Sequence, residues 1–407
     1  MSRRGAVRRR CTRCGASVRD GRCPKGHEGW SWSFTIDTAP VGAPRRQVTR
    51  SGFQTKREAL EALSQLQEQL RAHTFVEPSK RTLGDYLARW LDGLGATGLK
   101  PATIASYRET VELRVVPELG EVPLQALEPS DLDRLYARLL QEGRRRKEGG
   151  LSPRTVRYAH TVIRKALSDA MRKGLLVRNV ADLASPPSAK SARPPEMSFW
   201  TPEQLAVFLA SVAEDRLFPL WRTAAFTGMR RGELAGLRWS DVDLKGDERA
   251  PGRIAVRRQY TGDGTGSFSF QPPKTEHGRR LIELDAETVS VLAIWRRRQL
   301  EERMMLGLGD RADLVFSQPN GSPLRPDSGI SAAFDRLVAG VDLPRIRLHD
   351  LRHTHCAHMI ASGADLKAVA TRLGHASASF TLDRYGHLLP GQQAEAAARV
   401  AEMVDRD

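Results

Sequence analysis

Long hydrophobic runs are absent from this 407-residue chain. No stretch of about 18 apolar residues could span a membrane, and no hydrophobic signal-peptide segment follows the basic N-terminus. Lipidation motifs are missing as well. We therefore expect a soluble, intracellular protein that has no membrane partner.

Cysteine is scarce, with four in the chain, and three of them lie within residues 11–23. An odd group of three in a reducing compartment argues against disulfide pairing. Together with a histidine they form the spacing C-x2-C-x8-C-x3-H, which predicts a structural zinc site in a segment too small to build its own core. The predicted ligands are Cys11, Cys14, Cys23 and His27. The alternative is a set of incidental thiols in a basic tail, and the remaining Cys356 is expected to be a small buried residue.

Acidic residues are outnumbered, 48 against 64 lysines and arginines, which leaves a formal net charge of +16. Such an excess is typical of a protein whose partner is made of phosphates. The length allows two or three domains with substantial cores, and no long internal repeat is visible. The composition therefore indicates a multidomain protein that binds nucleic acid.

The N-terminal part carries a pattern for a small sheet and a helix. Residues 30–37, WSWSFTID, alternate strictly and predict a strand, and the basic residues 45–52 predict a second one. A helix is expected from Thr55, with apolar residues at steps of three and four. This module binds DNA or, alternatively, caps the chain or dimerises. The arginines among residues 3–10 add phosphate contacts or form a solvated tail.

From about Thr82 the pattern is helical. Pro101 opens a second helix, Ser130 is expected to cap a third, and Ser152 and Pro153 start a fourth. Four or five helices make a compact bundle. Residues 185–198, rich in Pro and Ser, then predict an extended linker.

The C-terminal half is expected to be mostly helical with a small antiparallel sheet. Thr201 and Pro202 start its first helix, and strands are predicted between residues 252 and 284, with Lys274 in their connection. Its motifs TGMRRGEL, HDLRH, LGH and LDRYGH contain Arg230, His349, Arg352, His375 and Tyr385.

These residue types suit an attack on a phosphodiester. Arginine is always charged, and its planar fork matches two phosphate oxygens at once. A tyrosine hydroxyl, with an ordinary pKa of about 10, becomes a nucleophile when a base or a cationic field activates it. Taken alone, His349 and Arg352 would be a solvated helix face, Tyr385 a half-buried core residue and Lys274 a solvated lysine. The complete set, in this order, favours an enzyme that cuts nucleic acid.

The motifs resemble those of the tyrosine recombinase, or phage integrase, family. That family combines an arginine in T-G-x-R-x-x-E-L, a hairpin lysine, the histidine and arginine of H-x-x-R, a histidine or tryptophan after L-G, and a tyrosine about ten residues later. All six residues are present here. The resemblance implies these roles: phosphate clamp for Arg230 and Arg352, general acid for Lys274, proton acceptor or orienting group for His349, further phosphate donor for His375, and nucleophile for Tyr385. The acidic Glu233 of the first motif is expected to be structural.

The resemblance also implies a fold, multidomain and mainly α (α+β). The expected parts are a basic tail with a zinc knuckle at 1–29, an arm-type DNA-binding domain at 30–76, a core-binding helical domain at 80–184, the linker at 185–198, and a catalytic domain with a C-terminal tail helix at 199–407. Residues near helix starts and on the basic strand are expected to contact DNA. They are Lys100, Thr103, Tyr107, Arg154, Thr155, Arg157, Tyr158, Arg45, Arg46 and Arg50.

The activity implied is that of a site-specific DNA recombinase, an integrase, which cleaves and rejoins strands through a 3′-phosphotyrosyl intermediate to integrate or excise a mobile element. No cofactor is implied for catalysis, so zinc would be structural. The expected partners are double-stranded DNA with core-type and arm-type sites, three further copies in a tetramer, and a host bending protein and a directionality factor, in the cytoplasm of a bacterial host at the nucleoid. The alternatives are a type IB topoisomerase-like enzyme and a catalytically silent DNA-binding regulator.

Overall fold

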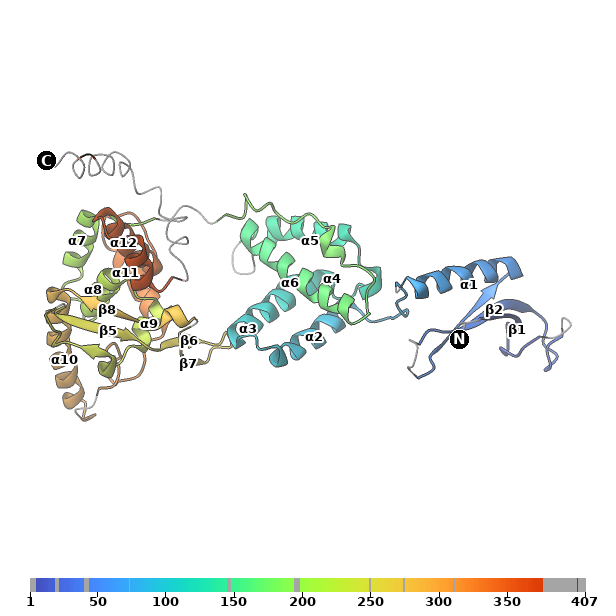
Figure 1. The fold of residues 1–407 in the computed structure, drawn as a ribbon, viewed down its shortest axis with the longest axis horizontal. Helices are drawn as coiled ribbons and strands as arrows, with labels where there is room; N and C mark the ends of the chain where they lie inside the picture. Colours follow the sequence, from blue (N-terminus) through green and yellow to red (C-terminus); the bar gives the residue numbers. More distant parts are fainter. Residues whose placement is uncertain are drawn as a thin grey trace. The chain divides into compact units, whose positions relative to one another are not determined.

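The computed structural model describes residues 5–18, 22–39, 44–72, 74–144, 148–193, 198–248, 250–273, 275–309, 312–375 and 401. The chain divides into two compact units (Figure 1). The first comprises Met1–Leu99 and Ser106–Arg193, and the second comprises Lys100–Ala105 and Pro194–Asp407.

The N-terminal part is a three-stranded antiparallel sheet covered on one face by a helix. The strands are β1 (Ala6–Cys11), β2 (Trp30–Asp37) and β3 (Gln47–Phe53), in the order β1-β2-β3, and the helix is α1 (Lys56–Arg71). Phe34 and Ile36 are buried against Leu63 and Leu66 of α1. The alternation in 30–37 therefore predicted β2 and its buried face correctly, whereas β1 lies in residues that were expected to be a tail.

The middle part is a helical bundle. Its elements are α2 (Leu83–Gly93), η1 (Leu94–Thr97), α3 (Pro101–Thr110), η2 (Val111–Val115), α4 (Val116–Leu119), η3 (Leu124–Ala126), α5 (Pro129–Glu142), α6 (Pro153–Arg172) and η4 (Val180–Asp182). The prediction that Ser130 caps a helix was wrong, because α5 already begins at Pro129 and Glu128 is its N-cap. The Glu128 backbone N–H donates to Asp131 at 2.9 Å, and Pro129 suits the first helical position because it needs no intrahelical partner for an N–H.

The second unit surrounds two small sheets with helices. The helices are α7 (Pro202–Ser211), α8 (Phe218–Thr227), α9 (Arg231–Gly236), η5 (Trp239–Asp241), η6 (Glu276–Gly278), α10 (Ala286–Met305), η7 (Pro326–Ser331), α11 (Ala332–Ala339), α12 (Leu348–Ala361) and α13 (Leu366–Leu373). The strands β4 (Val242–Asp243), β5 (Gly252–Val256) and β8 (Arg280–Leu284) form one sheet in the order β4-β5-β8. The strands β6 (Gln259–Gly262) and β7 (Phe268–Gln271) form a separate hairpin.

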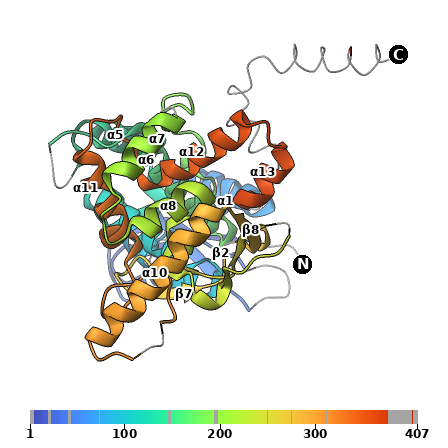
Figure 2. The ribbon, with the colours of Figure 1, turned by 90° about the vertical axis from the view of Figure 1, so that its left-hand side faces the viewer.

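Aromatic packing holds this second unit together. Helix α8 lies between α10 and α12 (Figure 2). Trp200, Phe208 and Trp221 are fully buried, and Phe334 of α11 packs against all three, with ring centroids 5.4–6.1 Å apart. Side chains of this size dominate core energetics, so the helices that carry the site motifs are anchored to one rigid core.

Among the described residues, no helix has the length and apolarity needed to cross a bilayer.

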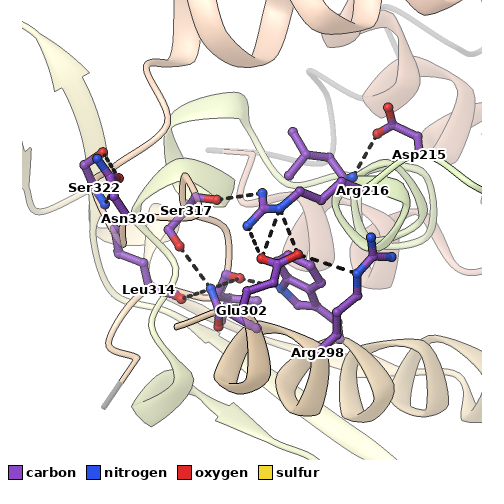
Figure 3. Close-up of polar contacts among 12 residues, drawn as sticks. Asp215, Arg216, Arg298, Glu302, Leu314, Ser317, Asn320 and Ser322 are labelled. Carbon is purple, nitrogen blue, oxygen red and sulfur yellow. Dashed lines mark hydrogen bonds and ion pairs between the residues drawn. The ribbon is translucent and has the colours of Figure 1, made fainter. Parts of the chain in front are cut away.

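A polar network joins α10 to the start of α8 (Figure 3). The Arg216 guanidinium donates to both carboxylate oxygens of Glu302, with the shortest contact at 2.7 Å, and to the Ser317 carbonyl at 3.0 Å. Arg298 also approaches Glu302, at 3.5 Å. No residue of the predicted site takes part in these contacts, so the network stabilises the unit without touching the site.

Candidate active site

Three arginines meet at the C-terminal end of α13. The carbonyl oxygens of residues 372–374 each accept a hydrogen bond from a different guanidinium group. Arg280 Nε lies 2.6 Å from the first oxygen, Arg352 Nη2 2.5 Å from the second, and Arg230 Nη2 3.2 Å from the third. The last carbonyls of a helix lack intrahelical donors and carry the negative end of its dipole, so they attract cations. The arginines are thereby held side by side.

A glycine turn lets α8, α12 and α13 approach one another closely. Gly228 ends α8 with a φ of 61°, in the left-handed region that favours glycine, and its carbonyl accepts from Arg352 Nη1 at 2.7 Å. A Cβ on Gly228 would lie only 2.6 Å from a methyl group of Leu373 and 3.0 Å from the ring of His355. The glycine of the TGMRRGEL motif is therefore required for α8, α12 and α13 to meet.

Glu233 is the anionic centre of the cluster. Its side chain is 2% exposed, and its oxygens accept from Arg280 at 2.8 and 3.1 Å, from Arg230 Nη1 at 2.8 Å and from the Arg230 backbone N–H at 2.8 Å. Burial works to raise the pKa of Glu233, but the hydrogen bonds and charge of Arg280 and the charge of Arg230 outweigh it and lower the pKa. The carboxylate is therefore ionised and orients both arginines.

Two of the predicted histidines flank these arginines. His349 lies at the start of α12 on the exposed side of the site, and His375 directly follows α13. Burial and, after it, the charges of Arg352, Arg230 and Arg280 together lower the pKa of His375 to about 3. The pKa of His349 is lowered by the same causes, partial burial first and then Arg352, although Asp350 opposes the shift. Both rings are therefore neutral at pH 7, when each can accept a proton or a hydrogen bond.

His355, three residues after Arg352, was not predicted to have a role. Its Nε2 accepts a hydrogen bond from Arg372 Nε at 3.1 Å, which requires an unprotonated nitrogen. Burial, together with the charges of Arg372 and Arg352, lowers the pKa of His355 to about 3. Arg372 also donates to the carbonyls of Glu283 and Phe226, both at 2.9 Å. His355 thus helps to fix α13 against α12.

Acid is expected to destabilise this unit through His355. Its pKa falls from 6.5 to about 3 on folding, so between these values the unfolded chain binds a proton that the folded chain does not. The stabilisation is complete above pH 6.5 and is lost as the pH falls towards 3. Between pH 7 and 5 the loss from this ring is about 2 kcal/mol, or roughly 4–8 °C in the unfolding midpoint. Calorimetry at both pH values measures it.

A His355→Gln variant provides the control for this pH dependence. Glutamine cannot bind a proton, yet its amide oxygen still offers an acceptor for Arg372. The midpoint of the variant should therefore change less between pH 7 and 5 than that of the natural protein. Equal changes in the two proteins would contradict the assignment.

The remaining members of the predicted set fall outside the described residues. These are Lys274, in the connection between β7 and β8, and Tyr385, ten residues beyond His375. The structure thus brings together Arg230, Arg352, His349 and His375.

The contacts with DNA that are expected in the helical part lie at or near α3 and α6. Lys100 and Thr103 lie at the start of α3, and Arg154 and Thr155 at the start of α6. Tyr158 Oη is 3.1 Å from the Ser106 hydroxyl, and its ring is 6.3 Å from that of Tyr107. Arg157 is turned inward instead, where it donates to the Pro187 carbonyl at 2.8 Å.

Of the three arginines expected to contact DNA on the N-terminal sheet, two lie beside acidic residues and one lies on the face that α1 covers. Arg45 lies 3.6 Å from Asp37, and Arg46 pairs with Glu77. Arg50 stands opposite Phe34, on the face of the sheet that α1 covers. The opposite face instead carries two arginines of β1 and the hydroxyl residues paired with or beside them: Arg8, Arg10, Ser31, Ser33, Thr35, Thr49 and Ser51. Because side chains alternate along a strand, Arg8 and Arg10 share this face once β1 is known to be a strand.

The four predicted metal ligands form one cluster. Their ligand atoms all lie within 4.8 Å of one another. Cys14 Sγ is 3.4 Å from Cys23 Sγ, and His27 Nδ1 is 3.8 Å from Cys11 Sγ and 4.0 Å from Cys23 Sγ. A tetrahedral zinc with Zn–S of about 2.3 Å and Zn–N of about 2.0 Å separates its ligands by about 3.5–3.8 Å. The donor set and its spacing therefore fit zinc.

Sequence reasoning missed two further features beside the site. The first is Arg280, whose contacts with Glu233 join residues 47 positions apart and leave no local pattern. The second is the β6–β7 hairpin, whose Tyr260 and Phe268 line a hollow together with Arg325, Arg230 and His349. The alternation of Phe268 and Phe270 after a glycine-rich turn could have indicated this hairpin.

Comparison with known proteins finds three matching families along the chain. Residues 203–391 match the Phage integrase family, residues 25–70 match an Arm DNA-binding domain, and residues 82–140 match the Phage integrase N-terminal SAM-like domain. The ICEBs1 integrase of Bacillus subtilis (strain 168) is 32% identical over 280 residues, which is 68% of this chain and 73% of the relative.

Two solved structures share the fold. The Tn1549 transposon integrase in complex with a circular intermediate DNA has a TM-score of 0.64 and 23% identity, covering 79% of this chain and 100% of the other. A lambda integrase tetramer bound to a Holliday junction has a TM-score of 0.52 and 16% identity, covering 88% and 96%. These likenesses confirm the predicted fold class, a multidomain and mainly helical protein with small antiparallel sheets.

Proposed function

We propose a role for each residue of this site. The starting point is that the chain belongs to the phage integrase family and is a tyrosine recombinase, an enzyme of site-specific DNA recombination. The Tyr385 hydroxyl attacks the scissile phosphorus. The bond to the 5′-oxygen breaks, leaving a 3′-phosphotyrosyl ester and a free 5′-hydroxyl. The hydroxyl of a partner strand then attacks this ester and releases the tyrosine, so the strands are rejoined without an external energy source.

The single observation that carries this proposal is the convergence of Arg230 and Arg352 on neighbouring carbonyls of α13. Charge grows on the non-bridging phosphate oxygens in the transition state, and donors that are already oriented stabilise it without reorganisation. The helix end, Glu233 and the Gly228 carbonyl hold these guanidinium groups in place before DNA arrives. We assign both arginines to the phosphate oxygens.

The protons are assigned to the remaining residues. His349, whose lowered pKa leaves it neutral, accepts the tyrosine proton or orients the hydroxyl. His375 donates a hydrogen bond to a phosphate oxygen, and Lys274 protonates the leaving 5′-oxygen. No cofactor takes part in this scheme.

The N-terminal part is proposed to bind a second kind of DNA site. The exposed face of its sheet combines Arg8 and Arg10 with hydroxyl side chains, which suits phosphate and base-edge contacts. We propose that Cys11, Cys14, Cys23 and His27 hold a structural zinc ion, which fixes the segment next to β1. The backbone N–H of Lys25 lies 3.4 Å from Cys23 Sγ, a contact that favours a thiolate ligand.

Four copies are proposed to act together on DNA. The structural likeness to a lambda integrase tetramer on a Holliday junction supports this number, since two strand exchanges need four tyrosines. The sequence-based division at 1–29, 30–76, 80–184, 185–198 and 199–407 is kept as a proposal, which limited proteolysis tests. We also propose that host bending and directionality factors take part and that the protein acts in the bacterial cytoplasm, where the DNA lies. Mass photometry of the protein on its DNA site checks the tetramer.

Covalent capture tests the function and supplies the DNA site. The protein is incubated with fragmented bacterial genomic DNA, the reaction is stopped with detergent, and the protein-linked strands are sequenced. We expect strands that end at a few related sequences and are joined through their 3′ phosphates. Ends scattered without sequence preference would favour a topoisomerase-like enzyme, and the absence of linked DNA would favour a silent regulator.

A further inference from the structure

Arg280 is buried beneath the two arginines assigned to the phosphate. Its side chain is 3% exposed, and four of its five N–H groups are used within the protein. Nε donates to the residue-372 carbonyl, Nη1 to Glu233 Oε1 and the Gly278 carbonyl, both at 3.1 Å, and Nη2 to Glu233 Oε2 at 2.8 Å. Its charge is matched by the buried carboxylate. Arg280 therefore lacks the donors and the access needed to clamp a phosphate.

The groups that Arg280 holds are the ones that orient Arg230. Glu233 shares its two oxygens between Arg280 and Arg230, so the direction of the carboxylate depends on both partners. Without Arg280, Glu233 would keep Arg230 as its main cation. Glu233 and Arg230 would then form a bidentate pair, and the N–H groups of Arg230 used in this pair would no longer be available to the phosphate. The residue-372 carbonyl, next to those that hold Arg352 and Arg230, would also lose its donor.

We infer that Arg280 is a positioning residue, which acts through Glu233 and the end of α13 to keep Arg230 directed at the scissile phosphate. The inference rests on the proposed function, since it presumes that Arg230 binds this phosphate. Arg280, the first residue of β8, thus contributes to catalysis without contacting DNA. Its effect should therefore disappear when Arg230 is absent.

The test measures covalent complex formation in single turnovers. The substrate is the duplex recovered by capture, nicked so that cleavage is not reversed. Arg280→Met should slow the reaction about 10²–10³-fold, the usual cost of one donor to a developing oxyanion. The Kd for the intact duplex should change less than about threefold, because one phosphate contact is a small part of a large charged interface. Arg280→Lys should recover part of the rate, since lysine reaches one carboxylate oxygen but cannot span both.

A double-mutant cycle with Arg230→Ala separates positioning from general damage. If Arg280 acts through Arg230, the combined variant should be no slower than Arg230→Ala alone. Arg280→Met/Glu233→Gln removes the uncompensated buried charge and keeps the test available if the single variant unfolds. Arg216→Met is the matched control, because Arg216 binds a carboxylate and a carbonyl in the same unit but outside the site (Figure 3). It should lower the unfolding temperature while leaving the rate of folded protein unchanged.

Three results would overturn the inference. They are a natural rate in folded Arg280→Met, losses that multiply in the combined variant, and equal slowing by Arg216→Met. If the natural protein forms no covalent complex, the proposed function itself fails and the inference fails with it. A failure confined to the Arg280 variants leaves the proposed function intact, so the two failures are distinguishable.

Discussion

Replacing Tyr385 by phenylalanine is expected to abolish covalent attachment of the protein to DNA. The substitution removes one oxygen atom, the proposed nucleophile, and leaves the ring, the arginines and the histidines in place. Loss of a nucleophile lowers the rate on the order of 10⁶-fold in enzymes that form covalent intermediates. The phosphotyrosyl band on a denaturing gel should therefore vanish.

The same variant should still bind DNA. Affinity depends on many phosphate contacts spread over a chain with a net charge of +16, and the tyrosine hydroxyl contributes little to it. A mobility-shift titration of the captured duplex should give similar Kd values for both proteins. As a control for tyrosine loss in general, Tyr136→Phe alters a buried tyrosine of α5 in the helical bundle and should keep the covalent band. A covalent complex formed by Tyr385→Phe would refute the assignment.

Removing zinc is expected to unfold the segment that precedes β2. Among the described residues of this segment, 11–18 and 22–27, the buried cluster consists of Cys11, Val18 and Cys23, with Cys14 packed against it. A cluster of this size is too small to hold the segment without a metal. Structural zinc ions in small fingers contribute apparent binding free energies of about 10–16 kcal/mol near pH 7. Chelation should therefore disorder the segment and weaken binding to a second DNA site, while cleavage at the core site persists.

Metal analysis and fluorescence measure this change. Purified protein should contain one zinc per chain, and Cys14→Ser should reduce that content. Trp30 and Trp32 lie on β2 beside Arg9, 4.3 and 5.0 Å from its guanidinium carbon, so their emission should shift when the segment unfolds. Cys356→Ala, which alters a buried cysteine of α12, is the control and should keep the zinc. Zinc-free protein with unchanged fluorescence after chelation would contradict the metal site.

Local patterns predicted several elements of the fold. The alternation in WSWSFTID gave β2, and Ser152 with Pro153 marked the start of α6, because these signals act between residues a few positions apart. The Ser130 prediction failed because Glu128, two residues earlier, is already the N-cap, and its backbone N–H donates to Asp131. Strand β1 was missed because three of its six residues are consecutive arginines, which give it no apolar alternation, and because it forms by pairing with β2.

The sequence by itself determined which chemistry this protein carries. Six arginine, histidine, lysine and tyrosine residues in family-like motifs predict an attack on a phosphodiester, because each residue type is required by charge or reactivity. The spacing of Cys11, Cys14, Cys23 and His27 likewise predicted a cluster that the fold brings within 4.8 Å. Such signals reside in residue identity and in short distances along the chain.

Only the tertiary structure decided how the arginines are held. Arg230 meets the end of α13 across 144 positions, Arg352 meets Gly228 across 124, and Arg280 meets Glu233 across 47. Hydrogen bonds between such distant segments follow no period, and they form only after α8, α12 and α13 have packed together. The structure therefore added Arg280, His355 and the helix-end carbonyls to a site whose reactive residues are predicted from the sequence.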